Sequence, residues 1–183
     1  MDYKWWLLIA ALLFVVGLIL GLTAFPDSPD FLSRDINGLK QFAGLLAPLP
    51  PWSLFGFIFI KNVAVLVLSF ILSPLLCLVP ILALTLNGWF LGWVSGMVLQ
   101  EEPLSYLLAG LLPHGIFELP ALIMGEAAAL SFGRGVMLAL FKRGGNGMTE
   151  QSLKRNFVYL MWAIALFLPA AIIEAFVTPL FLR

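Results

Sequence analysis

A histidine and a glutamate four residues apart are the residues of this sequence most able to do chemistry. His114 and Glu118 would lie on one face of a helix, because an α-helix repeats every 3.6 residues. Such a pair can exchange a proton, bind an ion, or fix packing through a hydrogen bond. The sequence leaves these roles open, and we favour the structural pair.

A metal centre needs more ligands than this pair supplies. Structural zinc sites usually have four ligands, and the chain has one histidine and one cysteine, Cys77. Zinc at His114 and Glu118 would need Glu174 and water to complete its coordination. We therefore predict no catalytic residue, no bound metal and no cofactor. Cys77 lies in an apolar run, and we interpret it as a small buried hydrophobic residue.

The sequence around these polar residues is that of a membrane protein. Of 183 residues, 62% are hydrophobic and 11% are charged, and ten basic residues balance ten acidic ones. The mean hydropathy is +1.04, whereas a soluble domain is roughly 25% charged. This composition argues against a soluble enzyme, a disordered tail, a disulfide scaffold and an electrostatic nucleic-acid binder. The lipid bilayer is the expected solvent.

Apolar runs of membrane-spanning length predict an all-α, polytopic transmembrane helical bundle with about five spans and short interfacial helices. The first run is interpreted as a retained anchor, because no small-residue cleavage pattern follows it. Asn87-Gly88 is the expected break between the second and third spans, and Ser73-Pro74 is the rival. One membrane domain, 1–183, would have spans at about 5–25, 62–85, 87–100, 105–126 and 157–177, an outer loop at 26–53 and a basic cytoplasmic loop at 127–156.

Basic residues orient the predicted spans. A cytoplasmic N-terminus places Lys4 and the five basic residues of the 127–156 loop inside, against three basic residues outside. An odd number of spans then places the C-terminus outside. Residues 132–143 mix basic and apolar side chains, and they predict a helix on the inner leaflet.

Ionisable residues at membrane depth need a partner or a function, because each costs at least ~2.5–3.5 kcal/mol on insertion scales. We predict a buried polar cluster in the outer half of the bilayer, with Glu118 deepest. Its members are His114, Glu118, Glu174 and Lys61. Glu126 is predicted at the cytoplasmic end of the fourth span, where it could accept hydrogen bonds from the start of the third span near Asn87.

Proline and glycine are expected to shape the third and fourth spans. Pro113 and Pro120 flank the His–Glu pair and Gly115 lies between them, which predicts a kinked helix facing protein or a cavity. Small residues recurring every four positions let helix backbones approach closely. They are Gly88, Gly92 and Gly96. We favour intramolecular packing of the third span, with a homodimer as the alternative.

Four patches between residues 54 and 180 carry a family resemblance. They are Ile60-Lys61-Asn62-Val63-Ala64, Leu86-Asn87-Gly88-x-x-Leu91-Gly92, Pro113-His114-Gly115-x-x-Glu118-Leu119-Pro120-Ala121 and Ile173-Glu174-Ala175-Phe176-Val177-Thr178-Pro179. Together they resemble the stage II sporulation protein M family of integral membrane proteins. The resemblance implies a multi-pass helical bundle in a prokaryotic plasma membrane. In spore formers the namesake is similar to a scaffold that joins two peptidoglycan-degrading proteins.

These observations lead to functions from different classes. We favour a non-enzymatic scaffold or assembly subunit of a cell-envelope complex, with membrane or envelope protein partners, a possible homo-oligomer and no nucleic acid. The alternative is a small transporter or channel with a polar path around the kinked fourth span. A third hypothesis is an intramembrane hydrolase, because Glu101-Glu102 resembles the paired glutamates of CAAX-type membrane proteases. Ser105 stands where that family has an arginine.

Overall fold

The computed structural model describes residues 2–24, 50–141 and 149–181, and those residues form helices and no strand. Within these described ranges, five helices are long and apolar enough to cross a membrane. They are α1 Tyr3–Ala24, α3 Pro51–Leu72, α4 Leu78–Glu101, α5 Leu104–Phe141 and α6 Glu150–Ile172, and α6 continues into the π-helix η1 Ile173–Val177 and the short α7 Thr178–Phe181. The predicted all-α membrane bundle is confirmed.

The outer faces of all five helices carry large exposed apolar side chains, as lipid-facing surfaces do. Examples are Leu12, Leu68, Leu82, Ile116 and Trp162, each more than half exposed. The inner faces combine large apolar side chains with small residues that allow close packing, including Ala121, Ala163 and Ala171, none of which is exposed. Without a hydrophobic driving force between helices in lipid, such close packing is what holds a membrane bundle together.

The break between the second and third spans lies at residues 73–77, so the predicted spans at 62–85 and 87–100 are wrong. Pro74 interrupts helical hydrogen bonding, and the chain turns through two residues with left-handed backbone, Leu76 at φ 55° and Cys77 at φ 56°. Asn87 lies inside α4, where its side chain donates to the Ala83 carbonyl one turn earlier at 2.6 Å. Residues 52–60, which precede the predicted second span, form the first turns of α3.

Much of the stretch predicted as the 127–156 loop is also helical. α5 runs 38 residues to Phe141, and α6 begins at Glu150, with Thr149 as its N-cap accepting from the Ser152 N–H at 3.2 Å. The helix predicted on the inner leaflet is therefore the last part of α5, as far as it is described. Residues 142–148, and residues 26–49 of the predicted outer loop, lie outside the described residues.

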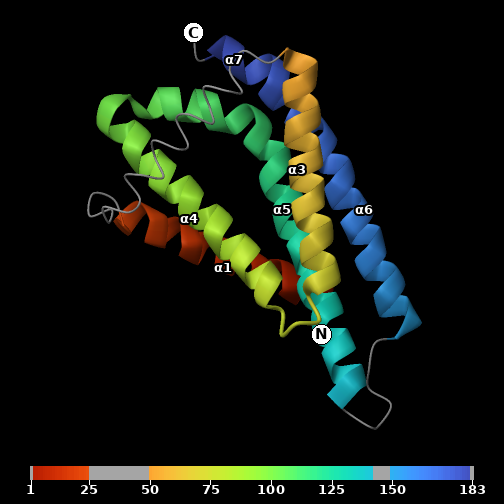
Figure 1. The fold of residues 1–183 in the computed structure, drawn as a ribbon. Helices are drawn as coiled ribbons and strands as arrows, with labels where there is room; N and C mark the ends of the chain where they lie inside the picture. The colour runs from red at the N-terminus through yellow and green to blue at the C-terminus, as the bar shows by residue number, and fades with distance from the viewer. Residues whose placement is uncertain (1, 25–49, 142–148, 182–183) are drawn as a thin grey trace.

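α1 and α4 pack side by side through glycines on both helices (Figure 1). A Cβ added at any of the four would strike the backbone of the other helix, so these contacts need glycine. Gly17 faces Thr85, Gly21 faces Trp89, Gly88 faces Phe14 and Gly92 faces Leu18. The repeat at Gly88 and Gly92 therefore serves an intramolecular interface.

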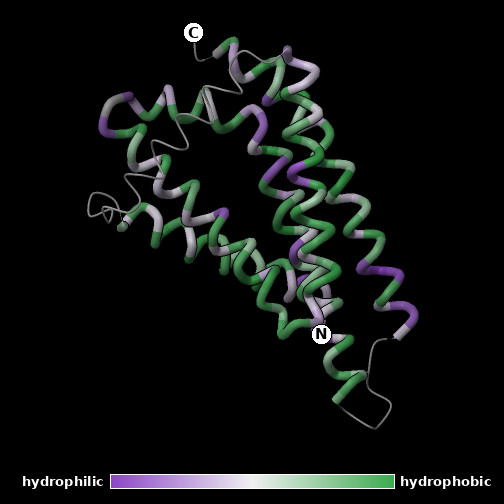
Figure 2. The backbone as a smooth tube through the Cα atoms, viewed as in Figure 1, coloured by the Kyte–Doolittle hydropathy of each residue, from purple (hydrophilic) through white to green (hydrophobic). Residues whose placement is uncertain are grey.

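α5 connects this pair to the other three helices. It starts beside the end of α4, crosses toward α3, bends, and descends between α3 and α6 (Figure 1). Pro113 and Pro120 lie inside the helix and account for a bend in this part of the chain. At about 1.5 Å per residue, 38 residues would span about 57 Å, well beyond a ~30 Å hydrocarbon core. Hydrophilic segments interrupt the apolar helices around this bend and at the start of α6 (Figure 2).

Candidate functional site

His114, Glu118 and Glu174 converge at one point of the bundle. Each offers one ligand atom, a ring nitrogen or a carboxylate oxygen, and these three atoms lie within 4.8 Å of one another. His114 Nε2 lies 3.9 Å from Glu118 Oε2. The side chains of His114 and Glu118 are 14% and 29% exposed, so both are largely shielded. Three of the four residues predicted to form a polar cluster therefore have their side chains next to one another.

α3 contributes two polar neighbours to this cluster. Asn62, 8% exposed, donates from Nδ2 to Glu118 Oε1 at 3.3 Å. Lys61 is exposed, acts electrostatically on Glu174, and lines cavities together with Glu118. The sequence marked Asn62 only as part of a family patch, because pairing between α3 and α5 depends on the tertiary fold.

Thr178 is a member of the site that sequence reasoning missed. Its hydroxyl donates to the Ile173 carbonyl at 3.3 Å, and its Oγ1 lies 3.3 Å from His114 Nδ1. The side chain is buried, with 7% exposed. A threonine hydroxyl costs little free energy in an apolar helix, so the residue type alone does not indicate a functional position. The only signal was its place in the last family patch.

Helix geometry explains how these side chains come together. His114 and Glu118 share one face of α5 because they are four residues apart. Glu174 lies on η1, where the wider π-turn rotates the residues that follow, and Thr178 comes directly after this turn. Single π-turns inside α-helices are rare and often mark functional sites.

Three cavities follow one another along the cluster and share lining residues. The first, about 190 Å³, lies between α4 and the start of α5 and extends from Val98 to His114. The second, about 200 Å³, shares His114 and adds Glu118 and Lys61. The third, about 100 Å³, shares Glu118 and Lys61 and reaches Leu66. His114, Glu118 and Lys61 of the polar cluster therefore line a run of open space that begins near the α4–α5 connection.

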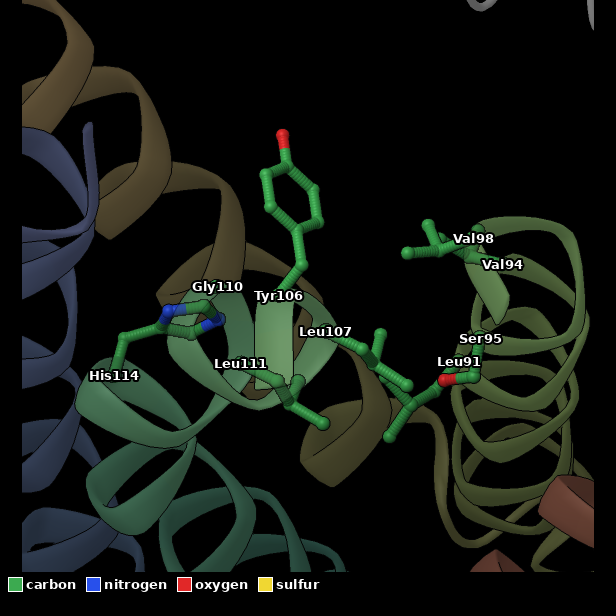
Figure 3. A pocket seen from close by; sticks show the side chains of 9 residues that line it. All are labelled: Leu91, Val94, Ser95, Val98, Tyr106, Leu107, Gly110, Leu111 and His114. Atoms are coloured by element: carbon green, nitrogen blue, oxygen red, sulfur yellow. The ribbon is translucent and has the colours of Figure 1, made fainter. Parts of the chain in front are cut away.

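Figure 3 shows the first of these cavities. Tyr106 and His114 line it from α5, and Leu91 and Val98 line it from α4. Apart from His114, Tyr106 and Ser95, its lining side chains are aliphatic or glycine. The opening between the two helices is thus mostly apolar, and polar groups increase toward Glu118.

Glu126 lies about two turns further along α5 and is fully buried. Its Oε2 accepts a hydrogen bond from Ser69 Oγ on α3 at 2.5 Å, while its Oε1 has no partner among the described residues. The predicted position at a helix end, beside the start of another helix near Asn87, is wrong because α5 continues to Phe141 and Asn87 is mid-helix. The carboxylate belongs to the interior of the α3–α5 contact.

Residues 10–179 match the sequence profile described as "Stage II sporulation protein M". The chain belongs to this family. The match includes every residue of the polar cluster and the four patches that carry the resemblance. The sequence-based assignment to the family is therefore confirmed, together with a membrane location of the chain.

Two archaeal proteins from Methanocaldococcus jannaschii are similar to this member of the stage II sporulation protein M family. The uncharacterized protein MJ0793 is 27% identical over 174 residues, which are 94% of this chain and 93% of the relative. The uncharacterized protein MJ0706 is 29% identical over 120 residues, 64% of this chain and about half (52%) of that relative. No solved structure matches the chain.

Proposed function

We propose that this member of the stage II sporulation protein M family is a small membrane transporter or channel for a cation. The observation that carries the proposal is the run of cavities past His114, Glu118 and Lys61. Ionisable groups at membrane depth are costly and typically mark ion or substrate pathways. A purely structural polar pair would be expected to close against protein, whereas this cluster faces open space.

The charges of the cluster favour a positively charged substrate. Glu118 and Glu174 supply two carboxylates, against the single ammonium group of Lys61, and His114 adds an imidazole that can bind a cation or take a proton. A cavity of about 200 Å³ has room for several water molecules. Polar walls and water together lower the cost of holding a small ion inside the bilayer.

The path has a constriction where the third cavity ends. Leu66 is 1% exposed, and its side chain fills the space beside Gly125 on α5. Beyond it along α3 and α5 lie Ser69 and Glu126, the next polar pair. Leu66 therefore separates the cavity-lining cluster from a second buried carboxylate, and it is the residue expected to gate passage between them.

Ion flux in proteoliposomes tests the proposal. Vesicles would carry trapped dyes for protons, for sodium and for divalent cations, with outward or inward gradients of H⁺, Na⁺, Mn²⁺ and Zn²⁺ applied in turn. We expect flux of at least one cation, its loss in the His114→Ala/Glu118→Gln double variant, and an unchanged thermal midpoint of that variant. If the flux of all four ions were no faster than in vesicles without the protein, the proposal would be overturned.

The scaffold role is the second outcome of the same experiment. A scaffold that uses the cluster only for packing would show no flux, and the double variant would lose stability and no other property. Partners in the envelope and a homo-oligomeric state belong to that role, and both stay predictions. The thermal midpoint and the flux of one variant therefore separate the two functions.

A further inference from the structure

The orientation of His114 carries the first step of a more specific assignment. The Thr178 hydroxyl has one hydrogen and donates it to the Ile173 carbonyl. In the arrangement that keeps this donation, the Thr178 oxygen accepts from His114 Nδ1, 3.3 Å away, and the ring hydrogen of neutral His114 lies on Nδ1. The lone pair of Nε2 is left free, and that atom is the one that faces Glu118 Oε2 at 3.9 Å.

A lone pair facing a carboxylate oxygen calls for a positive group between them. Two acceptor atoms repel each other, and the repulsion is strong in a site shielded from water. Either a proton on Nε2 or a shared cation removes it, and with a metal ion both atoms become ligands. Glu174 offers a third ligand oxygen, and one ligand atom from each of the three residues lies within 4.8 Å of the other two.

The other polar atoms of two ligands are already held by the protein. Asn62 donates to Glu118 Oε1, which leaves Oε2 free to bind a cation shared with His114. Thr178 holds His114 Nδ1 in the same way. Metal ligands are typically oriented by such outer hydrogen bonds, and losing one commonly costs 10- to 100-fold in metal affinity. Asn62 and Thr178, both buried, fit this orienting role.

The donor set and its surroundings select the kind of ion. Mg²⁺ and Ca²⁺ prefer oxygen ligands, whereas an imidazole with two carboxylates suits first-row transition metals. Bond lengths of about 2.0–2.2 Å place the ligand atoms of a tetrahedral zinc ion roughly 3.4 Å from one another. Small side-chain rotations would bring the three ligand atoms of this site to such distances. The adjoining cavities give the ion a way in and leave room for water as a further ligand.

We propose that His114 Nε2, Glu118 and Glu174 bind one divalent first-row transition-metal ion of the Zn²⁺ or Mn²⁺ kind, oriented by Thr178 and Asn62. The assignment deepens the proposed cation transport by naming the cation, and its meaning for transport rests on that proposal. Two carboxylates balance the charge of such an ion. Lys61, exposed beside the cavities, balances part of their charge when the ion leaves.

Cobalt titration of the full chain in detergent tests the site. The protein would be purified with an affinity tag that contains no histidine, because His114 is the only histidine of the sequence. Visible d–d absorption of Co²⁺ would report one saturable site per chain, and Zn²⁺ would displace it. We expect the dissociation constant to rise at least tenfold in His114→Asn and in Glu174→Gln, and about tenfold in Thr178→Val. Glu126→Gln, a matched buried carboxylate outside the site, should bind Co²⁺ like the wild type.

A measurement on the wild-type chain keeps the proposal testable even if the variants fail to fold. The two nitrogen resonances of the single histidine would be followed by NMR, and Zn²⁺ should shift Nε2 while Nδ1 keeps its hydrogen. An unsaturable titration, or binding unchanged in His114→Asn, would overturn the site. Saturable binding without flux of any cation would contradict the transport proposal and leave the metal site standing. Flux of a cation without metal binding would support the transport proposal and overturn the metal site.

Discussion

The ring of Tyr3 at the start of α1 stacks on the ring of Tyr159 in α6, with centroids 3.6 Å apart and planes 2° from parallel. The Tyr3 hydroxyl also donates to the Met124 carbonyl at 2.6 Å, and the Arg155 guanidinium lies 5.9 Å from the Tyr3 ring centroid. The start of α1 and the first part of α6 therefore lie at the same end of the bundle. The cytoplasmic assignment of both Lys4 and Arg155 requires this neighbourhood, and the side of the membrane stays a prediction.

Cysteine labelling tests which side this is. In a Cys77→Ala background, Gly145→Cys should react with a membrane-impermeant maleimide only after cells are opened, because basic segments favour the cytoplasm. Glu101→Cys should react in intact cells, since one helix separates the two positions. Reaction of the first variant in intact cells would reverse the orientation.

Gly88→Ala should weaken the α1–α4 interface, because its Cβ would clash with the Phe14 carbonyl oxygen. We expect a loss of about 1–3 kcal/mol in the free energy of unfolding, the usual range for overpacking. Denaturant titration in mixed micelles would measure it. Gly56→Ala is the matched control, because its Cβ would meet no atom within 4 Å.

The oligomeric state of the same variants checks the intramolecular assignment of these glycines. Size-exclusion chromatography should give one elution volume for the wild type, Gly88→Ala and Gly56→Ala. If Gly88→Ala changed the oligomer but left unfolding untouched, the glycines would belong to an interface between chains.

Ser69 and Glu126 should stabilise the bundle as a coupled pair. The hydrogen bond between them joins α3 to α5, and such bonds in membrane proteins average about 0.6 kcal/mol in double-mutant cycles. We expect Ser69→Ala, Glu126→Met and the double variant to give a coupling of that order, because methionine has a similar length and no oxygen to accept the bond. Glu126→Ala should cost more, because it also leaves a cavity in a fully buried position. Strictly additive unfolding energies would mean that the two side chains do not interact.

Cys77 should react slowly with iodoacetamide at neutral pH. Burial raises the pKa of its thiol, and the hydrogen bond from the Arg134 backbone only partly opposes this. A raised pKa leaves less thiolate, the reacting species, so alkylation should become fast only as the pH rises above the range of an ordinary thiol. Leu75→Cys in a Cys77→Ala background is the control, because Leu75 is 60% exposed. Equal pH profiles for the two thiols would contradict the expectation.

The five helices were predictable because an apolar run in lipid must satisfy its own backbone hydrogen bonds, and a helix does so within one segment. The break at Asn87-Gly88 was wrong for a related reason. Turn preferences come largely from soluble proteins, whereas here Asn87 donates to its own helix and Gly88 serves the contact with Phe14.

The polar cluster was predictable in membership and not in geometry. The cost of charge in lipid singles out His114, Glu118 and Glu174 one by one. Their convergence depends on the bend of α5, which Pro113 and Pro120 indicate, and on the π-turn at Ile173–Val177, which no residue type indicates. The predicted position of Glu126 at a helix end is wrong because the helix is longer than the predicted span, and α5 continues to Phe141.

The π-turn at Ile173–Val177 also constrains the length of the chain. A π-turn is in effect an α-helix with one inserted residue, so a single deletion is the change that would remove it. Such a deletion would rotate Thr178 by about 100° around the helix axis relative to the residues before it. Thr178 and Glu174 could then not both face α5. Relatives that keep both side chains in use should therefore tolerate substitutions here far better than insertions or deletions.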